Sequence, residues 1–522
     1  MMGGVKQSSG DFPQLISTSM FLNDEQKLGF KFDRLTNFWV TSSVAIAQRG
    51  LTIKGFKNYL DTIKKWNIKN RNVVIDSYFL PLLRRYQVTG VKRLMESKSL
   101  LLGDEMGLGK TIQCAVALSS LGESAIVVCP NHLVQNWMSE LKKWTKNLAL
   151  YDRTKIPKNT RWGKLSRGVV YVVPYSQIHK LDNANCGVLI CDESHLLNSV
   201  ESRRTIGVAN IKATQKWFLS GTAFKNHPVE LWSQIILLGM RDFFGHTKSG
   251  FALGFGLCEF VEAQKLRSKP KGVGFKRPKS SPRMIPAHLK PLNDIPEHSI
   301  ALLEKGLKSF YLRRDKARHL NLPPKIRNFF RLGSTGRLEK NIAKQFGDLD
   351  LYEITTPNHI SELSAMRVES SLKMIQSSDF KSYATKLIES QSIVFAYHNE
   401  VLDTLVEYFK NMGVPIYTII RGDSPDQVTD AVEWFQNTDS GVLIVSIKKG
   451  STGLTLTNAK RICFVELDWT TAELDQCESR VHRFGKHGNT LIDYLVPSGG
   501  VDDLVLEKLQ FKELNNKILE EN

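Results

Sequence analysis

A glycine-rich turn followed by a lysine and a threonine is the sharpest chemical signal in the chain. In Leu101–Gln113, LLGDEMGLGKTIQ, an apolar strand runs into Gly107 and Gly109, and a helix is expected to start near Lys110. Glycines let backbone N–H groups curl around a phosphate, and a helix N-terminus adds favourable partial charge. Lys110 can then reach the β- and γ-phosphates of a nucleotide, and the Thr111 hydroxyl can hold Mg²⁺.

Two adjacent carboxylates form the second chemical signal. The segment VLICDESH ends an apolar strand with Asp192 and Glu193. Asp192 can hold Mg²⁺ through water, and Glu193 can orient or deprotonate the attacking water. An ordinary helix N-cap is the alternative interpretation, and it is disfavoured because a phosphate loop precedes this segment. That loop departs from the pattern GxxxxGK[ST], since Asp104 stands at its first glycine position, and its own alternative is a plain glycine-rich turn.

A pair of arginines far along the chain completes this chemistry. In QCESRVHRFG, one helical face would carry Gln476, Arg480 and Arg483, because they stand at i, i+4 and i+7. Arginines that face a γ-phosphate across a cleft stabilise the charge that develops during transfer, by roughly 10³–10⁵ in rate. A solvated, salt-bridged helix is the alternative. The phosphate site elsewhere in the chain favours the catalytic interpretation.

Two blocks of alternating strands and helices must position these groups. The blocks run from about Leu80 to Met240 and from about Glu304 to Pro497. Short apolar strands between helices predict parallel sheets that are covered on both faces. The predicted strands are AIVVCP, GVVYVVPY, GVLICDE and KWFLSGT in the first block, and SIVFAY, VPIYTII, GVLIVS, RICFVEL and TLIDYLV in the second. The fold class is therefore α/β, with two lobes in tandem.

Changes in composition and in the alternation of strands and helices along the chain predict five segments. Leu504, Phe511, Leu514 and Ile518 fall on one helical face and predict a C-terminal brace helix. The segments are an N-terminal α+β module (1–76), a first lobe that binds ATP (77–250), a basic insertion (251–303), a second lobe (304–500) and the brace (501–522).

Composition favours a polyanionic partner. The 522 residues carry a net charge of +19, although ribosome-associated and membrane-surface proteins are equally basic. No apolar run approaches the roughly 20 residues that span a bilayer, and no signal peptide is evident. The seven cysteines are scattered without a CxxC pair, which favours reduced thiols over disulfides or zinc. We expect a soluble intracellular protein, cytoplasmic if bacterial or phage and nuclear if eukaryotic.

In this order, the motifs resemble helicase superfamily 2, and specifically its Swi/Snf-type branch of double-stranded DNA translocases. The resemblance covers about Leu80 to Gly500. It implies two RecA-like lobes that share one ATP and Mg²⁺ site. It also implies that Gln87, in LRRYQVTG, contacts adenine, and that GDEMGLGKT is the family's own nucleotide-binding loop, which accounts for Asp104.

The same resemblance implies a set of DNA contacts. CPNHLVQNWMSELKKW resembles motif Ia and VVPYSQI motif Ic, whereas LSGTAFKNHPVELWSQI resembles motif III and SIKKGSTGLTLTNA motif V. The residues expected at DNA are Asn136, Trp137, Tyr175, Ser176, Lys225, Lys276, Arg277, Gly450, Ser451 and Thr452. Contacts of this kind position a duplex without distinguishing its sequence. No sequence-specific DNA-binding motif is present in the sequence, and the protein partners stay unknown.

The insertion and the N-terminal module refine the expectation. Between Gln264 and Lys290 lie nine Lys or Arg, four prolines and no Asp or Glu, which predicts a sequence-blind grip on phosphates or else a merely solvated loop. Two short sequences, GLT at Gly453–Thr455 and FVEL with Glu466, resemble those of the annealing-helicase branch. The stretch LGFKFDRLTNFWVT predicts a hairpin that resembles the HARP module of that branch, although a structural hairpin is the alternative.

These features predict a monomeric, DNA-dependent ATPase that translocates on double-stranded DNA and remodels branched DNA by fork regression, branch migration or strand annealing. A strand-separating DNA or RNA helicase and a nucleosome remodeller would use the same motor. A binding scaffold with an inactive ATPase is the remaining alternative. It would require the loss of a catalytic group, yet Lys110, Asp192, Glu193, Arg480 and Arg483 are all present.

Overall fold

The architecture was obtained as a computed structural model of the whole chain. It describes residues 6–7, 16–18, 31–33, 38–41, 67–68, 72–152, 162–224, 227–244, 247–261, 264–265, 284–285, 288–292, 295, 297–320, 322–334, 357–450, 454, 456–468, 471–483, 485–486, 488–498, 502 and 506. Within this part of the chain, no helix combines the length and the apolar character needed to cross a membrane.

The first lobe is built on a seven-stranded parallel sheet in the order β15-β5-β10-β9-β6-β8-β7. Its strands are β5 (Ser99–Leu102), β6 (Ala125–Cys129), β7 (Ala149–Asp152), β8 (Val169–Pro174), β9 (Asn185–Asp192), β10 (Lys212–Leu219) and β15 (Tyr311–Leu312). The central strands are continuous apolar runs because helices cover both faces of the sheet. The four strands predicted in this block are confirmed.

Helices form two layers over this sheet. One apolar core lies under α4 (Arg85–Glu96), α5 (Lys110–Leu121) and α6 (Val134–Trp144). The other core lies under α7 (Arg203–Ala209), α8 (Leu231–Leu237), α10 (Lys248–Gly254) and α11 (Glu297–Leu307). The short α9 (Arg241–Phe244) follows α8. The glycine loop thus lies between β5 and α5, as predicted.

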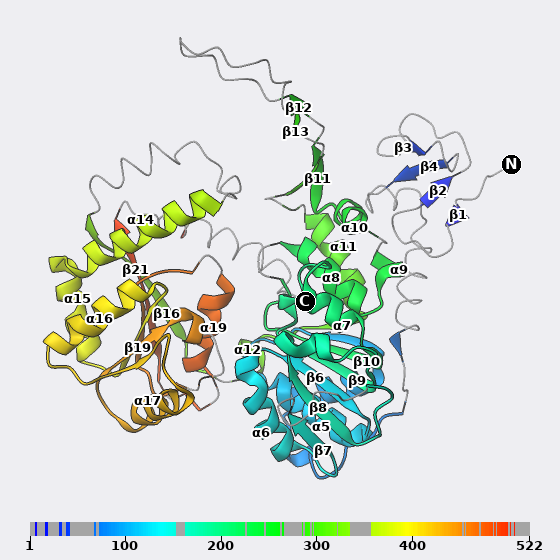
Figure 1. Cartoon of the computed structure of the whole chain (residues 1–522), viewed down its shortest axis with the longest axis horizontal. Coiled ribbons are helices and arrows are strands. Elements are labelled where there is room, and N and C mark those ends of the chain that lie inside the picture. Colours follow the sequence, from blue (N-terminus) through cyan, green and yellow to red (C-terminus); the bar gives the residue numbers. More distant parts are fainter. Residues whose placement is uncertain are drawn as a thin grey trace.

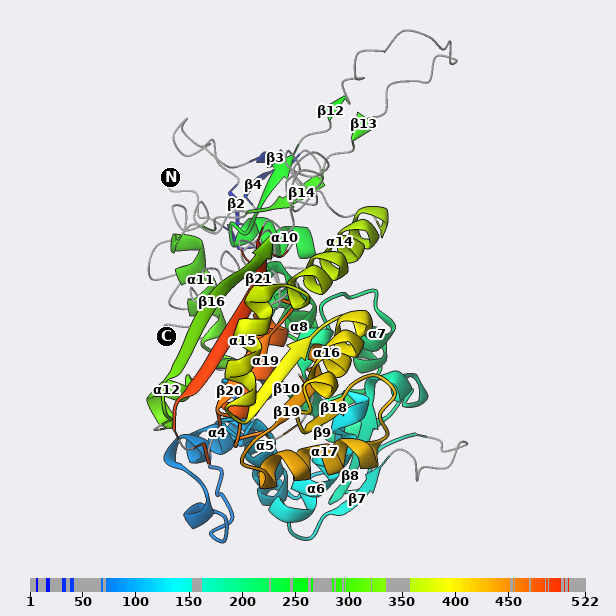
Figure 2. The ribbon, with the colours of Figure 1, turned by 90° about the vertical axis from the view of Figure 1, so that its left-hand side faces the viewer.

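The second lobe holds a six-stranded parallel sheet in the order β16-β21-β20-β17-β19-β18 (Figure 2). Its strands are β16 (Lys325–Ser334), β17 (Ser392–Ala396), β18 (Ile416–Ile419), β19 (Val442–Ser446), β20 (Arg461–Phe464) and β21 (Thr490–Ser498). All five strands predicted in this block are confirmed. Figure 1 shows the two sheets side by side in separate lobes, so the expected pair of tandem RecA-like lobes is present.

Helices also cover both faces of the second sheet. The helices α15 (Ser378–Ile388) and α16 (Asn399–Asn411) pack on one face, and α17 (Pro425–Asn437) and α19 (Thr471–Val481) pack on the other. The long α14 (Pro357–Ile375) contributes to both cores, and the short α18 (Ile447–Gly450) follows β19. The helix α19 therefore carries the candidate arginine segment on the face opposite α15 and α16.

A small antiparallel sheet belongs to the N-terminal segment. Its order is β1-β2-β4-β3, formed by β1 (Lys6–Gln7), β2 (Ile16–Thr18), β3 (Lys31–Asp33) and β4 (Phe38–Thr41). The pairing of Phe32 with Trp39 confirms the predicted hairpin around the DRLTN turn. Most of the remaining residues of this module, and all of its side chains before position 67, lie outside the described part of the chain.

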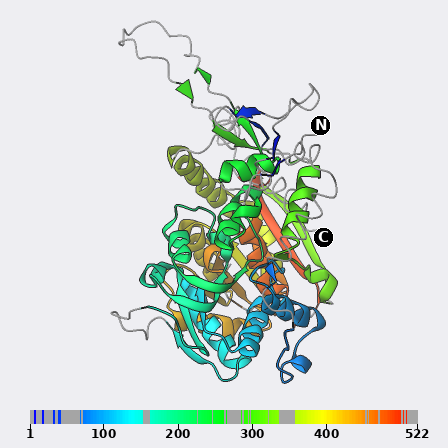
Figure 3. The same cartoon turned by 90° about the vertical axis from the view of Figure 1, so that its right-hand side faces the viewer.

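The insertion forms a projecting hairpin between α10 and α11, within the first lobe. The strands β11 (Cys258–Val261) and β14 (His288–Pro291) pair antiparallel, and so do β12 (Gln264–Lys265) and β13 (Met284–Ile285). The three views agree that this hairpin and the N-terminal sheet lie at the same end of the molecule (Figures 1–3). The predicted DNA contacts Lys276 and Arg277 lie outside the described residues.

The structure moves the predicted boundary between the lobes. We expected the second lobe to begin at residue 304, but Leu307 and Phe310 are buried in the core of the first lobe. The strand β15 then pairs with β5, so the first sheet continues to Leu312. Of the predicted brace helix, only Asp502 and Leu506 lie among the described residues.

Candidate functional site

The glycine loop has the backbone shape that phosphate binding requires. Gly107 and Gly109 have φ of 90° and 77°, which L side chains rarely adopt, and Gly109 caps the start of α5. The Lys110 Nζ donates a hydrogen bond of 2.6 Å to the backbone oxygen of Asp104 and closes the loop. Burial lowers the pKa of Lys110, whereas the charges of Glu193, Asp104 and Asp192 oppose that change.

Asp104 supports the loop from inside. Its carboxylate is fully buried and accepts hydrogen bonds from Arg314 Nε at 2.8 Å and from Gln113 Nε2 at 3.0 Å. Arg314 follows β15, so the loop is tied to the segment that leaves the first lobe. We predicted Asp104 among the nucleotide-binding residues. In this structure its side chain is turned to Arg314 and Gln113, and what it presents to the lysine is its backbone oxygen.

Gln87, the predicted adenine contact, is also held by neighbouring backbone. Its Oε1 accepts from the N–H of Arg84 at 3.0 Å, which forms part of a capping box at the start of α4. Its Nε2 donates to the backbone oxygen of Leu108 at 3.3 Å. A Cβ on Gly109 would lie 2.7 Å from this nitrogen. Gln87 is therefore packed against the loop, and its contact with adenine stays a prediction.

The carboxylate pair lies where β9 ends, close to the glycine loop. Burial and the adjacent charge of Glu193 raise the pKa of Asp192 to about 6. Burial also acts to raise the pKa of Glu193, but the hydrogen bond and charge of His195, with the charges of Lys110 and Arg480, lower it to about 2. Glu193 has a φ of 49°, a backbone conformation that is unfavourable for a residue other than glycine and that is concentrated at functional sites.

The arginines of the second lobe lie against this site. The charges of Arg480 and Glu193 act on each other's pKa, although the two residues belong to different lobes. A Cβ on Gly107 would lie 3.7 Å from the Cβ of Arg483. Gln476 is buried within α19. The helix ends at Val481, so Arg483 stands beyond the predicted helical face, and the structure still brings both arginines to the first lobe.

Lys316 is a contact between the lobes that the sequence did not predict. Its Nζ donates to the backbone oxygen of His482 at 3.1 Å and lies 3.7 Å from Glu105. The backbone N–H of Lys316 also donates to the Glu105 carboxylate at 2.7 Å. Burial lowers the pKa of Lys316 to about 8, against the charge of Glu105. The sequence shows only a charged stretch, RRDK, whose tertiary partners cannot be identified from spacing.

The residues around the phosphate loop fit a magnesium ion that is bound together with nucleotide. The buried Asp192, the partly exposed Glu193 and the Thr111 hydroxyl supply hard oxygen atoms, and a divalent cation would relieve the repulsion that raises the pKa of Asp192. Among the described residues, no group of three or more His, Cys, Asp or Glu could hold a metal ion. The phosphates would therefore have to complete the coordination.

The residues predicted at DNA divide into two groups. Asn136 and Ser176 are exposed, as a DNA contact requires. Trp137 is fully buried and Tyr175 is only 6% exposed, so their side chains do not reach a surface, and Gly450, which has no side chain, is buried as well. The prediction that the side chains of Trp137 and Tyr175 contact DNA is corrected, because both side chains face the core. Their sequence neighbours Asn136 and Ser176 are the exposed residues. The others, Lys225, Lys276, Arg277, Ser451 and Thr452, lie outside the described residues.

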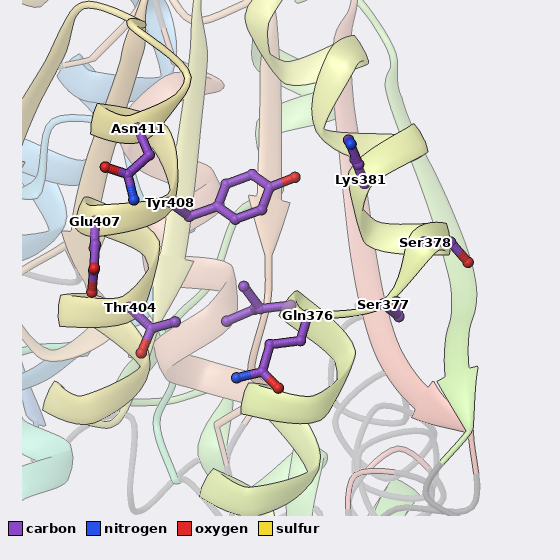
Figure 4. Close-up of a pocket in the computed structure, with 9 residues that line it drawn as sticks. Gln376, Ser377, Ser378, Lys381, Thr404, Glu407, Tyr408 and Asn411 are labelled. Carbon is purple, nitrogen blue, oxygen red and sulfur yellow. The ribbon is translucent and has the colours of Figure 1, made fainter.

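A cavity of about 390 Å³ lies on the second lobe, away from the candidate site (Figure 4). Its lining comes from the end of α14, the start of α15, and α16, and it includes Lys381, Glu407 and Tyr408. These helices pack on the sheet face opposite α19. No residue predicted for chemistry lines this cavity.

Two α/β lobes that bring a phosphate loop, a carboxylate pair and two arginines together define an ATP-hydrolysing core. A family model described as SNF2-related domain matches residues 65–378, more than half of the chain, and a helicase conserved C-terminal domain matches residues 376–485. The chain belongs to the SNF2-related family and is an ATP hydrolase.

Similar curated proteins include two larger relatives. The chain is 28% identical over 456 residues to the SWI/SNF-related matrix-associated actin-dependent regulator of chromatin subfamily A-like protein 1 of Xenopus laevis, which covers 84% of this chain and 44% of that protein. It is 27% identical over 435 residues to the human DNA annealing helicase and endonuclease ZRANB3, and this match covers 79% of this chain and 38% of that protein. The chain spans less than half the length of these two relatives.

Among solved structures, the Sulfolobus solfataricus SWI2/SNF2 ATPase core in complex with dsDNA is similar at 18% identity. The match covers 87% of this chain and 97% of that chain with a TM-score of 0.37.

Proposed function

We propose that this SNF2-family ATPase is driven by duplex DNA, moves along it as a monomer, and remodels branched DNA by fork regression, branch migration and strand annealing. The split site is the observation that carries the proposal: a Cβ on Gly107 of the phosphate loop would lie 3.7 Å from the Cβ of Arg483 in the second lobe, and the charge of Arg480 acts on Glu193 across the same boundary. Hydrolysis at such a site depends on how the lobes meet, which is how a motor converts ATP turnover into domain movement.

The proposed roles follow from the positions of the groups. Lys110 releases the Asp104 carbonyl and binds the β- and γ-phosphates of ATP. Glu193, whose pKa stays low, orients and deprotonates the attacking water. Arg480 and Arg483 bind the γ-phosphate and stabilise its developing charge. Bound Mg²⁺, held by Thr111 and Asp192, would supply charge neutralisation between the phosphates.

DNA is the proposed track because the exposed groups and the charge suit a polyphosphate. Asn136 and Ser176 are exposed polar residues on two segments of the first lobe. A net charge of +19 supports binding of a polyanion, and the basic insertion around Lys276 and Arg277 adds a candidate grip. Contacts of this type position phosphates without distinguishing sequence.

Branched DNA is the proposed substrate because of two observations that point the same way. One of the similar proteins is by name a DNA annealing helicase. The N-terminal segment forms a small antiparallel sheet with a β3–β4 hairpin, and we propose this sheet as an accessory DNA-binding module. Its position at the same end of the molecule as the projecting hairpin suits a role in holding a second DNA arm (Figures 1–3).

The proposal is tested by measuring ATP hydrolysis while adding single-stranded DNA, plain duplex, forked DNA and RNA. We expect stimulation by duplex, more by forked DNA, and little by RNA. Turnover that ignores all four would contradict the proposal. Product strands then separate the activities: a model fork should be converted to regressed arms and annealed duplex, whereas release of single strands from a flayed duplex would indicate a strand-separating helicase instead.

A further inference from the structure

Two hydrogen bonds from different segments converge on Asp192. The indole N–H of Trp137, on α6, donates to Asp192 Oδ2 at 2.8 Å. The hydroxyl of Tyr175, at the start of the 3-10 helix Tyr175–Lys180, donates to the backbone oxygen of Asp192 at 2.9 Å. The other carboxylate oxygen accepts from the N–H of Glu193 at 2.9 Å. Asp192 is thus fixed in both its side chain and its backbone.

Each of the two donor residues is adjacent in sequence to an exposed residue of the first lobe. Trp137 follows the exposed Asn136, and Tyr175 precedes the exposed Ser176. Trp137 is 0% and Tyr175 is 6% exposed, so neither can bind a ligand itself. A shift of either backbone segment would therefore displace a hydrogen-bond donor of Asp192.

Trp137 makes a specific hydrogen bond to Asp192 in addition to packing in the core. Two other tryptophans of the same lobe provide the comparison. The indole N–H groups of Trp144, on the same helix, and of Trp217, on β10, have no hydrogen-bond partner among the described residues. Trp217 is as fully buried as Trp137. A buried N–H that meets a carboxylate at 2.8 Å is what orients that carboxylate.

We propose that Trp137 and Tyr175 are positioning residues that orient Asp192 for metal-bound nucleotide and couple it to the surface formed around Asn136 and Ser176. The coupling part of this inference rests on the proposed function, since it takes DNA to be what occupies that surface. Hydrogen-bond partners of a metal-holding carboxylate change metal affinity by roughly 10–100-fold when they are removed.

The orientation is tested with Trp137→Phe, which removes the N–H but keeps an aromatic ring, against the matched control Trp217→Phe. Binding of a fluorescent ATP analogue is titrated with Mg²⁺ in the absence of DNA. We expect the half-saturating Mg²⁺ concentration to rise about tenfold or more in Trp137→Phe. In Trp217→Phe it should stay near the wild-type value. Thermal unfolding of both variants confirms that each is folded. Equal Mg²⁺ requirements in the two variants would overturn the inference.

The coupling is tested by the ratio of ATP turnover with and without duplex DNA. We expect Tyr175→Phe and Trp137→Phe to lower this ratio by about fivefold or more, and Trp217→Phe to keep the wild-type ratio. Wild-type ratios in both of the first two variants would overturn the coupling. A wild-type enzyme that ignores DNA would overturn the proposed function together with the coupling, and the Mg²⁺ titration without DNA would still decide whether Trp137 orients Asp192.

Discussion

Glu478 should anchor the helix that carries the arginines, and the variant Glu478→Gln measures this anchor. The carboxylate is fully buried on α19, two residues before Arg480. It accepts hydrogen bonds from Lys325 Nζ at 2.8 Å, from Arg327 Nε and Nη2 at 2.8 and 2.7 Å, and from the Tyr494 hydroxyl at 2.5 Å. These donors lie on β16 and β21, so the carboxylate ties α19 to one edge of the second sheet.

The size of the effect follows from the pKa of this carboxylate. Burial acts to raise the pKa of Glu478, but Lys325 and Arg327 lower it from the ordinary 4.5 to about 2. Since one pKa unit corresponds to about 1.4 kcal/mol, the depression corresponds to about 3 kcal/mol of stability. Arg327 is 36% exposed, so solvent screening reduces the loss expected in Glu478→Gln to about 2 kcal/mol. Because the folded pKa is depressed, the contribution is complete above pH 4.5 and disappears toward pH 2.

Urea unfolding of the wild type and the variant, from pH 7 down to pH 3, measures the difference in free energy of unfolding. The matched control is Glu369→Gln, because Glu369 pairs with Lys373 at 2.7 Å where both side chains are about half exposed. That pair should contribute less than about 0.5 kcal/mol. The reasoning is refuted if Glu478→Gln costs no more than the control at pH 7, or if its cost stays constant down to pH 3.

Four further outcomes are expected. Lys110→Ala should abolish hydrolysis while DNA binding, followed by fluorescence anisotropy, is retained. Glu193→Gln should lower the rate of phosphate release by roughly 10²–10⁴-fold, with little change in nucleotide affinity; unchanged turnover would remove Glu193 from its role. Arg480→Ala should lower kcat by roughly 10³-fold or more, with a much smaller change in KM; an effect on KM alone would make this arginine a binding group. The affinity for duplex DNA should fall steeply and linearly on a log–log plot as salt rises, and a flat plot would argue against a phosphate grip.

The regular parts of the fold could be predicted because each carries its own signal. Buried parallel strands such as Ala125–Cys129 and Val442–Ser446 are continuous apolar runs, and short helices separate them. The strand β16 (Lys325–Ser334) was not predicted. Its sequence, KIRNFFRLGS, mixes cations with apolar residues because it lies at the edge of the second sheet and pairs only with β21. An edge strand of this kind resembles a charged loop.

The candidate site shows a similar division between local and tertiary information. Lys110 and Asp192 were predicted because a phosphate loop and a strand end are local patterns. Trp137 was assigned to DNA because the resemblance locates a whole motif, whereas the burial of one side chain depends on which helical face meets the sheet. Arg483 was placed on a helical face because periodicity gives no signal for where a helix ends, and α19 ends at Val481. Lys316 could not be predicted, since its partners lie in two lobes.

The path of the chain between the lobes explains why these tertiary contacts gather at one place. Because β15 is part of the first sheet and β16 begins the second, the crossing lies within residues 313–324. The crossing starts beside the phosphate loop, where Arg314 bonds Asp104, and Lys316 then reaches the backbone of His482 in the second lobe. A rotation of one lobe against the other must therefore bend this segment or break the 3.1 Å contact of Lys316. In either case, movement of the second lobe changes the structure within a few residues of the loop that we propose binds the phosphates.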